Sequence, residues 1–216
     1  MKAQFLSVPA LLCCFALTTP AQAQQILSVT SSASATTASY DGIMEKLAAK
    51  NLTDYGWTFH AIGAGESGGL FSIGLFPTQA DFDARLQKVR PVFEEAGFVL
   101  PVPQTFSVHR TFAAPLPADK PANGILVFFD IKGMSAGQYD QVVAGVQKSG
   151  LPPIPAGQLF HAAFVTPDGI KVIDIWESAE QFQAFGNTLM PVLQAAGVTP
   201  PPPTVYRLYN YLAPRH

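Results

Sequence analysis

The chain has 216 residues, 48% of them hydrophobic and 13% charged, and a formal net charge of −2. No basic stripe runs along it, which argues against nucleic acid as a partner. The two cysteines, Cys13 and Cys14, both lie in an N-terminal segment that we expect to be removed. The remaining chain would have no disulfide, so its stability must come from burying a core.

Residues 1–23 have the features of a secretory signal peptide. Lys2 supplies the positive start, the run from Phe5 to Thr18 is apolar, and "AQA" at residues 21–23 is a typical cleavage site. A lipoprotein processed at Cys14 is a weaker alternative, because no small residue directly precedes that cysteine. We therefore expect a periplasmic or secreted protein. No later apolar run has the length of a membrane helix, so no membrane contact is expected after cleavage.

A long internal repeat divides the rest of the chain. The sequence "PVFEEAGF" at residues 91–98 returns as "PVLQAAGV" at residues 191–198. A repeat of this length is a whole domain rather than one unit of a solenoid. We predict a first repeat at residues 24–112, a proline-rich linker at 113–121 and a second repeat at 122–213. Further matched positions are Tyr40 and Tyr139, Asp41 and Asp140, and His60 and His161.

Both repeats are predicted to follow the order strand, helix, strand, strand, helix, strand. The first, from Ile26 to Phe112, has looser patterning and a glycine-rich hairpin loop, "GAGESGG". In the second, Ser135 and Ser178 are each followed three residues later by glutamine, which predicts two helix starts with capping boxes. Its strands are predicted at residues 125–131, 159–165, 170–176 and 205–212. Gly97 and Gly197 predict left-handed helix ends. The fold class is therefore α+β, with tandem ferredoxin-like (βαββαβ) repeats.

The stretch "FHAAFVTPDGIKVIDIWESAEQFQAFGNTLMPVLQAAGV" at residues 160–198 resembles the dimeric α/β-barrel superfamily, which includes the antibiotic-biosynthesis-monooxygenase-like proteins. The resemblance rests on the pattern W-E-S…F…F…L-x-P, which begins at Trp176. It implies that ferredoxin-like domains pack sheet to sheet, so two copies in one chain would close the barrel within the chain. The first copy departs from the pattern, with "FPT" at residues 76–78 where the second copy has "WES".

Side-chain alternation gives each strand two different faces. One face is apolar in both copies, as at Ile73, Leu75, Ile173 and Ile175, and we expect it to pack under the helices. The other face is polar and aromatic, and we expect it to line the barrel interior as a ligand cavity. In the second copy this other face is predicted to carry Asp174, Trp176, Arg207, Tyr209 and Tyr211.

His161 is predicted to lie directly opposite Asp174 if "TPDG" forms a four-residue hairpin loop. A histidine oriented by a carboxylate is the arrangement that a general base needs. In this interpretation Arg207 or Tyr209 would hold an oxyanion, and the catalytic candidates are His161, Asp174 and Tyr209. Isolated pairs of this kind are more often ordinary polar contacts, and that alternative stays open. A hairpin loop with an odd number of residues would turn His161 to the helix side.

The first copy keeps the histidine as His60 but has Gly74 where the second copy has Asp174. The repeat therefore fits a functional histidine, and it fits a structural histidine shared by both copies equally well. The positions predicted to bind a ligand are His60, Trp176, Arg207 and Tyr211.

No metal site and no cofactor are predicted. The four histidines lack the close spacing of zinc ligands, and no cysteine follows residue 14. The loop "GAGESGG" lacks the lysine and hydroxyl residue that end a phosphate loop. Haem is not expected, because no histidine falls on a recognisable proximal helix.

Three functions remain open. The first is a cofactor-independent monooxygenase or isomerase acting on a small aromatic molecule, which the resemblance implies together with the polar face of His161. The second is a non-catalytic module that holds a small apolar or aromatic ligand in the barrel. The third is a structural protein whose barrel is filled by large side chains. A monomer or a weak homo-oligomer is expected in each case.

Overall fold

The structure is a computed structural model that describes residues 24–53, 56–117, 119–152 and 154–212, so the expected signal peptide lies outside the described residues. The first copy consists of β1 (Ile26–Ser32), α1 (Thr37–Ala49), β2 (Phe59–Ala64), β3 (Leu70–Phe76), α2 (Gln79–Glu95) and β4 (Gln104–Ala113). The second consists of β5 (Ile125–Lys132), α3 (Ala136–Lys148), β6 (Gln158–Thr166), β7 (Gly169–Trp176), α4 (Ala179–Ala195) and β8 (Thr204–Leu212). The predicted order of elements is confirmed in both copies.

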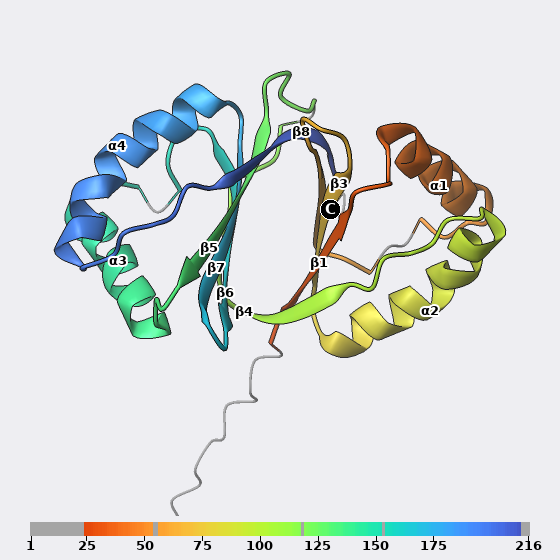
Figure 1. Ribbon diagram of the computed structural model, residues 1–216, viewed down its shortest axis with the longest axis horizontal. Coiled ribbons are helices and arrows are strands. Elements are labelled where there is room, and N and C mark those ends of the chain that lie inside the picture. Colours follow the sequence, from red (N-terminus) through yellow and green to blue (C-terminus); the bar gives the residue numbers. More distant parts are fainter. Residues whose placement is uncertain (1–23, 54–55, 118, 153, 213–216) are drawn as a thin grey trace, which may run out of the picture.

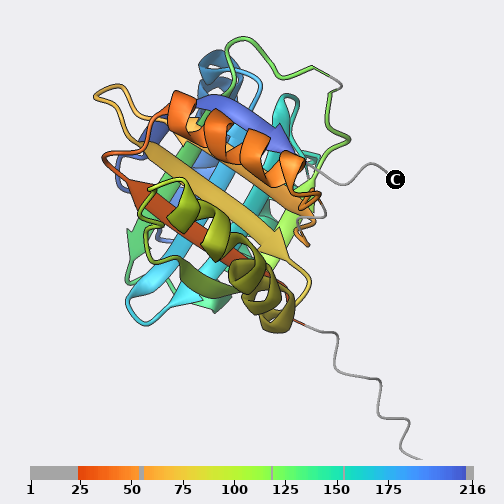
Figure 2. The same cartoon turned by 90° about the vertical axis from the view of Figure 1, so that its right-hand side faces the viewer.

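The eight strands form one closed barrel in the order β1-β3-β2-β8-β5-β7-β6-β4. The last strand of each copy joins the two sheets, because β4 pairs with β1 and with β6, and β8 pairs with β5 and with β2. Figure 1 shows the barrel between two helical layers, with α1 and α2 on one side and α3 and α4 on the other. Figure 2 shows α1 and α2 crossing the outer face of the first copy's strands. The prediction of a barrel closed within one chain is confirmed.

The barrel interior is packed with apolar side chains, so the predicted orientation of the strand faces was wrong. Ile73, Leu75, Ile173 and Ile175 belong to one buried cluster that joins the two sheets. Within it, the rings of Phe59 and Phe160 stack with their centroids 4.1 Å apart. The more apolar face occupies the interior because a closed barrel removes that face from water completely.

The polar and aromatic face therefore lies under the helices, where Ser72 and Gly74 face α1 and α2, and Asp174 faces α3 and α4. Helices cover this face with apolar side chains of their own, and a cavity remains between the sheet and the helices in each copy. Asp174 and Trp176 consequently lie outside the barrel rather than inside it. Tyr211 is the exception, because a register shift in the pairing of β2 with β8 lets it pack against the interior cluster.

The helix ends follow the sequence signals with one exception. Ser135 forms the predicted capping box with Gln138. Ser178 caps α4 by accepting from the backbone N–H of Gln181, but the Gln181 side chain donates to Glu177 instead of returning to the cap. Gly97 and Gly197 have φ of 66° and 67°, as expected for helix ends of this type. Within the described residues, no helix is both long and apolar enough to cross a bilayer.

Candidate functional site

Each copy encloses a cavity between its sheet and its two helices. The cavity of the first copy, the N-terminal cavity, has a volume of about 180 Å³, and the cavity of the second, the C-terminal cavity, about 150 Å³. His60 lines the first and His161 lines the second. The repeated histidine thus occupies the same kind of place in both halves of the molecule.

In the C-terminal cavity, His161 lies directly opposite Asp174 in the β6–β7 hairpin, as predicted from an even loop. The Nδ1 atom of His161 is 2.7 Å from Oδ1 of Asp174, and both side chains are largely buried. An ionised carboxylate can only accept, so Nδ1 carries the proton and donates it. Gln158 donates to the same carboxylate oxygen over 2.9 Å, which further fixes the acid.

The other ring nitrogen of His161 contacts Tyr139, a residue that was not predicted to belong to the site. Tyr139 comes from α3, and its hydroxyl is 2.6 Å from Nε2 of His161. Because Nδ1 holds the ring proton, Nε2 is the acceptor and the phenol is the donor. Burial, and then the charge of Asp174, raise the pKa of Tyr139, so the phenol stays protonated. The result is a directed chain from Tyr139 through His161 to Asp174.

The walls of the C-terminal cavity are otherwise mainly apolar. They include Phe112 of β4, Met134 before α3, Val142 of α3 and Leu189 of α4. A cavity with apolar walls and a few converging polar groups suits a small organic ligand. Among its polar groups, the hydroxyl of Tyr139 can pass a proton to an imidazole that a carboxylate stabilises.

A second polar cluster adjoins Tyr139 and was also missed. Nε2 of His109 is 3.0 Å from Oδ1 of Asp140, and Arg110 donates to the same oxygen over 3.1 Å. A register shift in β4 between Val108 and Arg110 accompanies this arrangement. The His109 ring meets the Tyr139 ring edge-on at 5.6 Å. The match of Tyr139 and Asp140 with Tyr40 and Asp41 in the repeat was the available sequence signal for this region.

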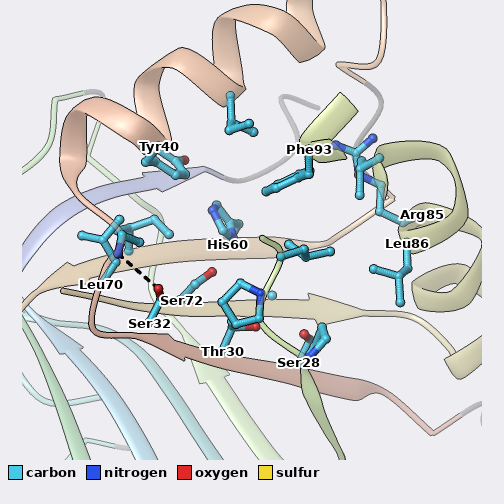
Figure 3. A pocket seen from close by; sticks show the side chains of 18 of the residues that line it. Ser28, Thr30, Ser32, Tyr40, His60, Leu70, Ser72, Arg85, Leu86 and Phe93 are labelled. Carbon is cyan, nitrogen blue, oxygen red and sulfur yellow. Dashed lines mark hydrogen bonds between the residues drawn. The ribbon is translucent and has the colours of Figure 1, made fainter. Parts of the chain in front are cut away.

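Figure 3 shows His60 among the side chains that line the N-terminal cavity. Here the histidine is held differently from His161. Its Nδ1 donates to the carbonyl oxygen of Ile73 over 2.7 Å, and its ring stacks on Trp57 at 4.1 Å. Gly74 lies opposite His60, so no carboxylate occupies the place of Asp174. Burial lowers the pKa of His60 from 6.5 to about 4, and the ring is therefore neutral at neutral pH. His60 and His161 lie in separate cavities.

The remaining predicted site residues do not join His161. Tyr209 donates to Asp41 of α1 over 2.5 Å, and Tyr211 donates to the carbonyl oxygen of Pro117 over 2.8 Å. Arg207 is exposed. Trp176 is fully buried among side chains of the second copy, which include Phe182 and Phe185 of α4. The expected grouping of Tyr209, Arg207 and Tyr211 with His161 depended on a shared cavity in the barrel interior, which is packed.

No residues that could hold a metal come together in the described ranges, since no three His, Cys, Asp or Glu side chains gather there. Four polar residues of the C-terminal cavity, Tyr139, His161, Asp174 and Gln158, form one hydrogen-bonded group. Gln147 also lines the cavity, from an exposed position on α3.

The sequence matches no protein-family model and no curated protein. Solved structures do match. A provisionally named monooxygenase from Lactobacillus acidophilus superposes with a TM-score of 0.62 at 11% identity, covering 88% of this chain and 96% of that chain. One from Fusobacterium nucleatum gives 0.61 at 9% identity, covering 86% and 92%. A ferredoxin-fold protein related to antibiotic biosynthesis monooxygenases, from Listeria monocytogenes, gives 0.50 at 10% identity, covering 88% and 96%.

At these identities the likeness shows the fold alone. The chain has a tandem ferredoxin-like fold closed into an α/β barrel, and it shares this fold with these solved structures.

Proposed function

We propose that the C-terminal cavity binds a small aromatic molecule and removes a proton from it, as a cofactor-independent monooxygenase or isomerase does. The observation that carries this proposal is the chain Tyr139–His161–Asp174 in the lining of a mainly apolar cavity of about 150 Å³. The fold shared with proteins named as monooxygenases agrees with it.

The geometry supports proton removal by relay rather than by His161 directly. Both ring nitrogens of His161 are occupied, so a substrate meets the hydroxyl of Tyr139 first. A substrate O–H, or a C–H beside a carbonyl, gives its proton to the Tyr139 oxygen while Tyr139 passes its own proton to Nε2 of His161. The imidazolium that forms is stabilised by Asp174. No free tyrosinate is needed, in keeping with the raised pKa of Tyr139.

The product of this step is an enolate or phenolate in apolar surroundings. Return of the proton to another carbon completes an isomerisation. Reaction with O₂ gives the net conversion R₂CH₂ + O₂ → R₂C=O + H₂O, which balances with O₂ as the only oxidant. The signal peptide expected at residues 1–23 supports a periplasmic or secreted site for this activity. The barrel closed within one chain supports a protein that needs no partner copy.

A second candidate is a binding protein without turnover. It is favoured by the hydrogen bonds of His161, which are complete without any ligand. In this binding protein the cavity holds the ligand, and the hydrogen bonds from Tyr139 to Asp174 stabilise the fold.

The barrel interior is filled with large apolar side chains, as expected for the third function predicted from the sequence, a structural protein.

Proton exchange separates the two candidates. A small aromatic ketone such as 2-tetralone would be incubated with the protein in D₂O, and loss of its acidic C–H signals followed by NMR. We expect exchange above the buffer rate, and we expect Tyr139→Phe to reduce it by about 10²–10⁴-fold with little change in binding. Tyr209→Phe, which removes a hydroxyl bonded to Asp41 and outside the C-terminal cavity, is the matched control. Binding of the ketone without exchange would establish the binding protein instead.

A further inference from the structure

On its strand side, the N-terminal cavity is lined by serine and threonine side chains, which the C-terminal cavity lacks. Ser28 and Thr30 of β1 and Ser72 of β3 line it, and Thr30 is paired with Ser72 across the strands. The matching positions of the second copy hold apolar residues, which are Val127, Phe129 and Val172. Figure 3 shows the hydroxyl groups of Thr30 and Ser72 below the ring of His60. The two cavities therefore differ in chemistry although their folds match.

His60 brings an unsatisfied acceptor to this cavity. Because Nδ1 donates to the Ile73 carbonyl, Nε2 is left with a lone pair. His60 is 6% exposed, and Nε2 is buried with no hydrogen-bond partner among the described residues. Buried polar atoms are almost always paired, so the unpaired acceptor of His60, a residue that lines the cavity, points to a missing donor.

Three hydroxyl side chains of the same cavity are also available to a ligand. Within the parts of the chain that the structure describes, the side chains of Ser28, Thr30 and Ser72 form no hydrogen bond. A hydroxyl can both donate and accept, so these groups can serve a ligand whose own hydroxyl is directed to His60.

The opposite wall of the cavity is apolar, so the part of the ligand that contacts it should be apolar as well. Ile43 and Leu47 of α1 and Val89 and Phe93 of α2 line the cavity above the sheet. Figure 3 shows Phe93 and Tyr40 above the level of His60, with the hydroxyl groups beneath. A volume of about 180 Å³ is close to that of the roughly 150 Å³ cavity known to hold benzene in another protein. One aromatic ring therefore fits.

The charged side chain of this cavity, Arg85, already has interactions within the protein. Arg85 is buried, donates to the Leu52 carbonyl oxygen over 3.3 Å and lies 5.7 Å from the centre of the Trp57 ring. The ligand therefore does not need a negative charge to pair with Arg85. A neutral ligand also matches the neutral imidazole, whose stacking on Trp57 fixes the direction of the lone pair.

We propose that the N-terminal cavity is a second, non-catalytic ligand site, which takes a small neutral phenol or alcohol whose hydroxyl donates to Nε2 of His60. Ser72 or Thr30 donates to the same ligand oxygen, and the apolar body packs against α1 and α2. No carboxylate stabilises an imidazolium here, because Gly74 stands where Asp174 stands in the second copy. The site therefore binds its ligand without taking the proton.

Two methionines allow the cavities to be observed separately. Met44 lines the N-terminal cavity and Met134 lines the C-terminal cavity. The protein would be labelled with [methyl-¹³C]methionine and titrated with p-cresol and, in parallel, with 4-methylanisole, which has the same body but no hydroxyl donor. We expect p-cresol to shift the Met44 methyl signal and to bind there about tenfold more tightly than 4-methylanisole. Equal affinities at Met44, or shifts of Met134 alone, would overturn the proposal.

Variants locate the contact. His60→Leu removes the acceptor and should abolish the tenfold preference, whereas Tyr139→Phe, in the other cavity, should leave the Met44 titration unchanged. A folded His60→Leu protein that keeps the preference would also overturn the proposal. If His60→Leu does not fold, Ser72→Val, which copies the second repeat, should weaken p-cresol more than 4-methylanisole. Because Met134 reports on the other cavity, failure here is distinct from failure of the proposed proton transfer.

Discussion

His60 lies directly across the β2–β3 hairpin from Gly74, the place that Asp174 occupies across from His161 in the second copy. One residue difference thus separates a histidine paired with a carboxylate from one paired with a backbone carbonyl. The duplicated fold has kept the histidine and changed its partner. The effect of the residue opposite the histidine can therefore be tested by comparing the two copies.

Replacing Gly74 by Asp should raise the pKa of His60 from about 4 towards its usual range. A carboxylate beside the ring favours the charged imidazolium and offsets part of the desolvation. The new Cβ would lie 3.0 Å from Cε2 of Phe76, so that ring must shift slightly. An NMR titration of the His60 ring protons measures the effect. Gly74→Asn, with the same size but no charge, should change the pKa much less. Equal shifts in both variants would contradict the charge argument.

His60 should make the protein less stable in acid. Its folded pKa is lowered from 6.5 to about 4, so the unfolded chain binds this proton more readily. The contribution is fully present above pH 6.5 and is lost as the pH falls to about 4. The loss corresponds to about 3 kcal/mol from a shift of this size. The groups that face His60 from neighbouring elements are Tyr40 of α1 and Arg85 of α2, and the charge of Arg85 lowers the pKa in the same direction.

Urea unfolding between pH 7 and 4 would measure this dependence. His60→Gln removes the titrating ring, so its free energy of unfolding should fall less across that range than the wild type's. The difference between the two curves isolates His60 from other groups that titrate in acid. Parallel curves would show that His60 titrates alike in the folded and unfolded states.

Tyr139→Phe should destabilise the folded protein as well as slow proton exchange. Loss of the hydroxyl leaves Nε2 of His161 without its donor in a largely buried place. An unsatisfied buried polar atom costs about 1–3 kcal/mol. Tyr209→Phe removes a hydroxyl whose partner, Asp41, is exposed at the surface, so its cost should stay below about 1 kcal/mol. Thermal or urea unfolding of the two variants provides the comparison, and equal costs would argue against a buried Tyr139–His161 bond.

The order of elements and the position of His161 opposite Asp174 could be predicted because both depend on local signals. Turn length fixes the register of a hairpin, and register fixes which side chains meet. The orientation of the faces could not be read in the same way. Alternation separates Ile173 and Ile175 from Asp174, but both faces of these strands are buried, one in the barrel and one under helices.

Tyr139 was missed for a different reason. Its spacing along α3 fits an apolar helix face, and its ring is indeed buried there. Only the hydroxyl reaches His161. Pattern alone cannot separate the packing role of a tyrosine ring from the hydrogen bond made by its end, although the match with Tyr40 in the repeat pointed to this position.

The packed barrel interior predicts where the two copies depend on each other. Phe160 of β6 is 1% exposed and stacks on Phe59 of β2, from the other copy. Phe160→Ala leaves a cavity between the sheets and should lower the free energy of unfolding by about 3–5 kcal/mol. Val165→Ala, at a partly exposed position of the same strand, should cost less than about 1 kcal/mol. Because β4 and β8 each pair with both copies, unfolding of the Phe160 variant should remain a single transition by circular dichroism and by Trp fluorescence. Two separated transitions would show that the copies fold independently, and a small cost for Phe160→Ala would contradict a tightly packed interior.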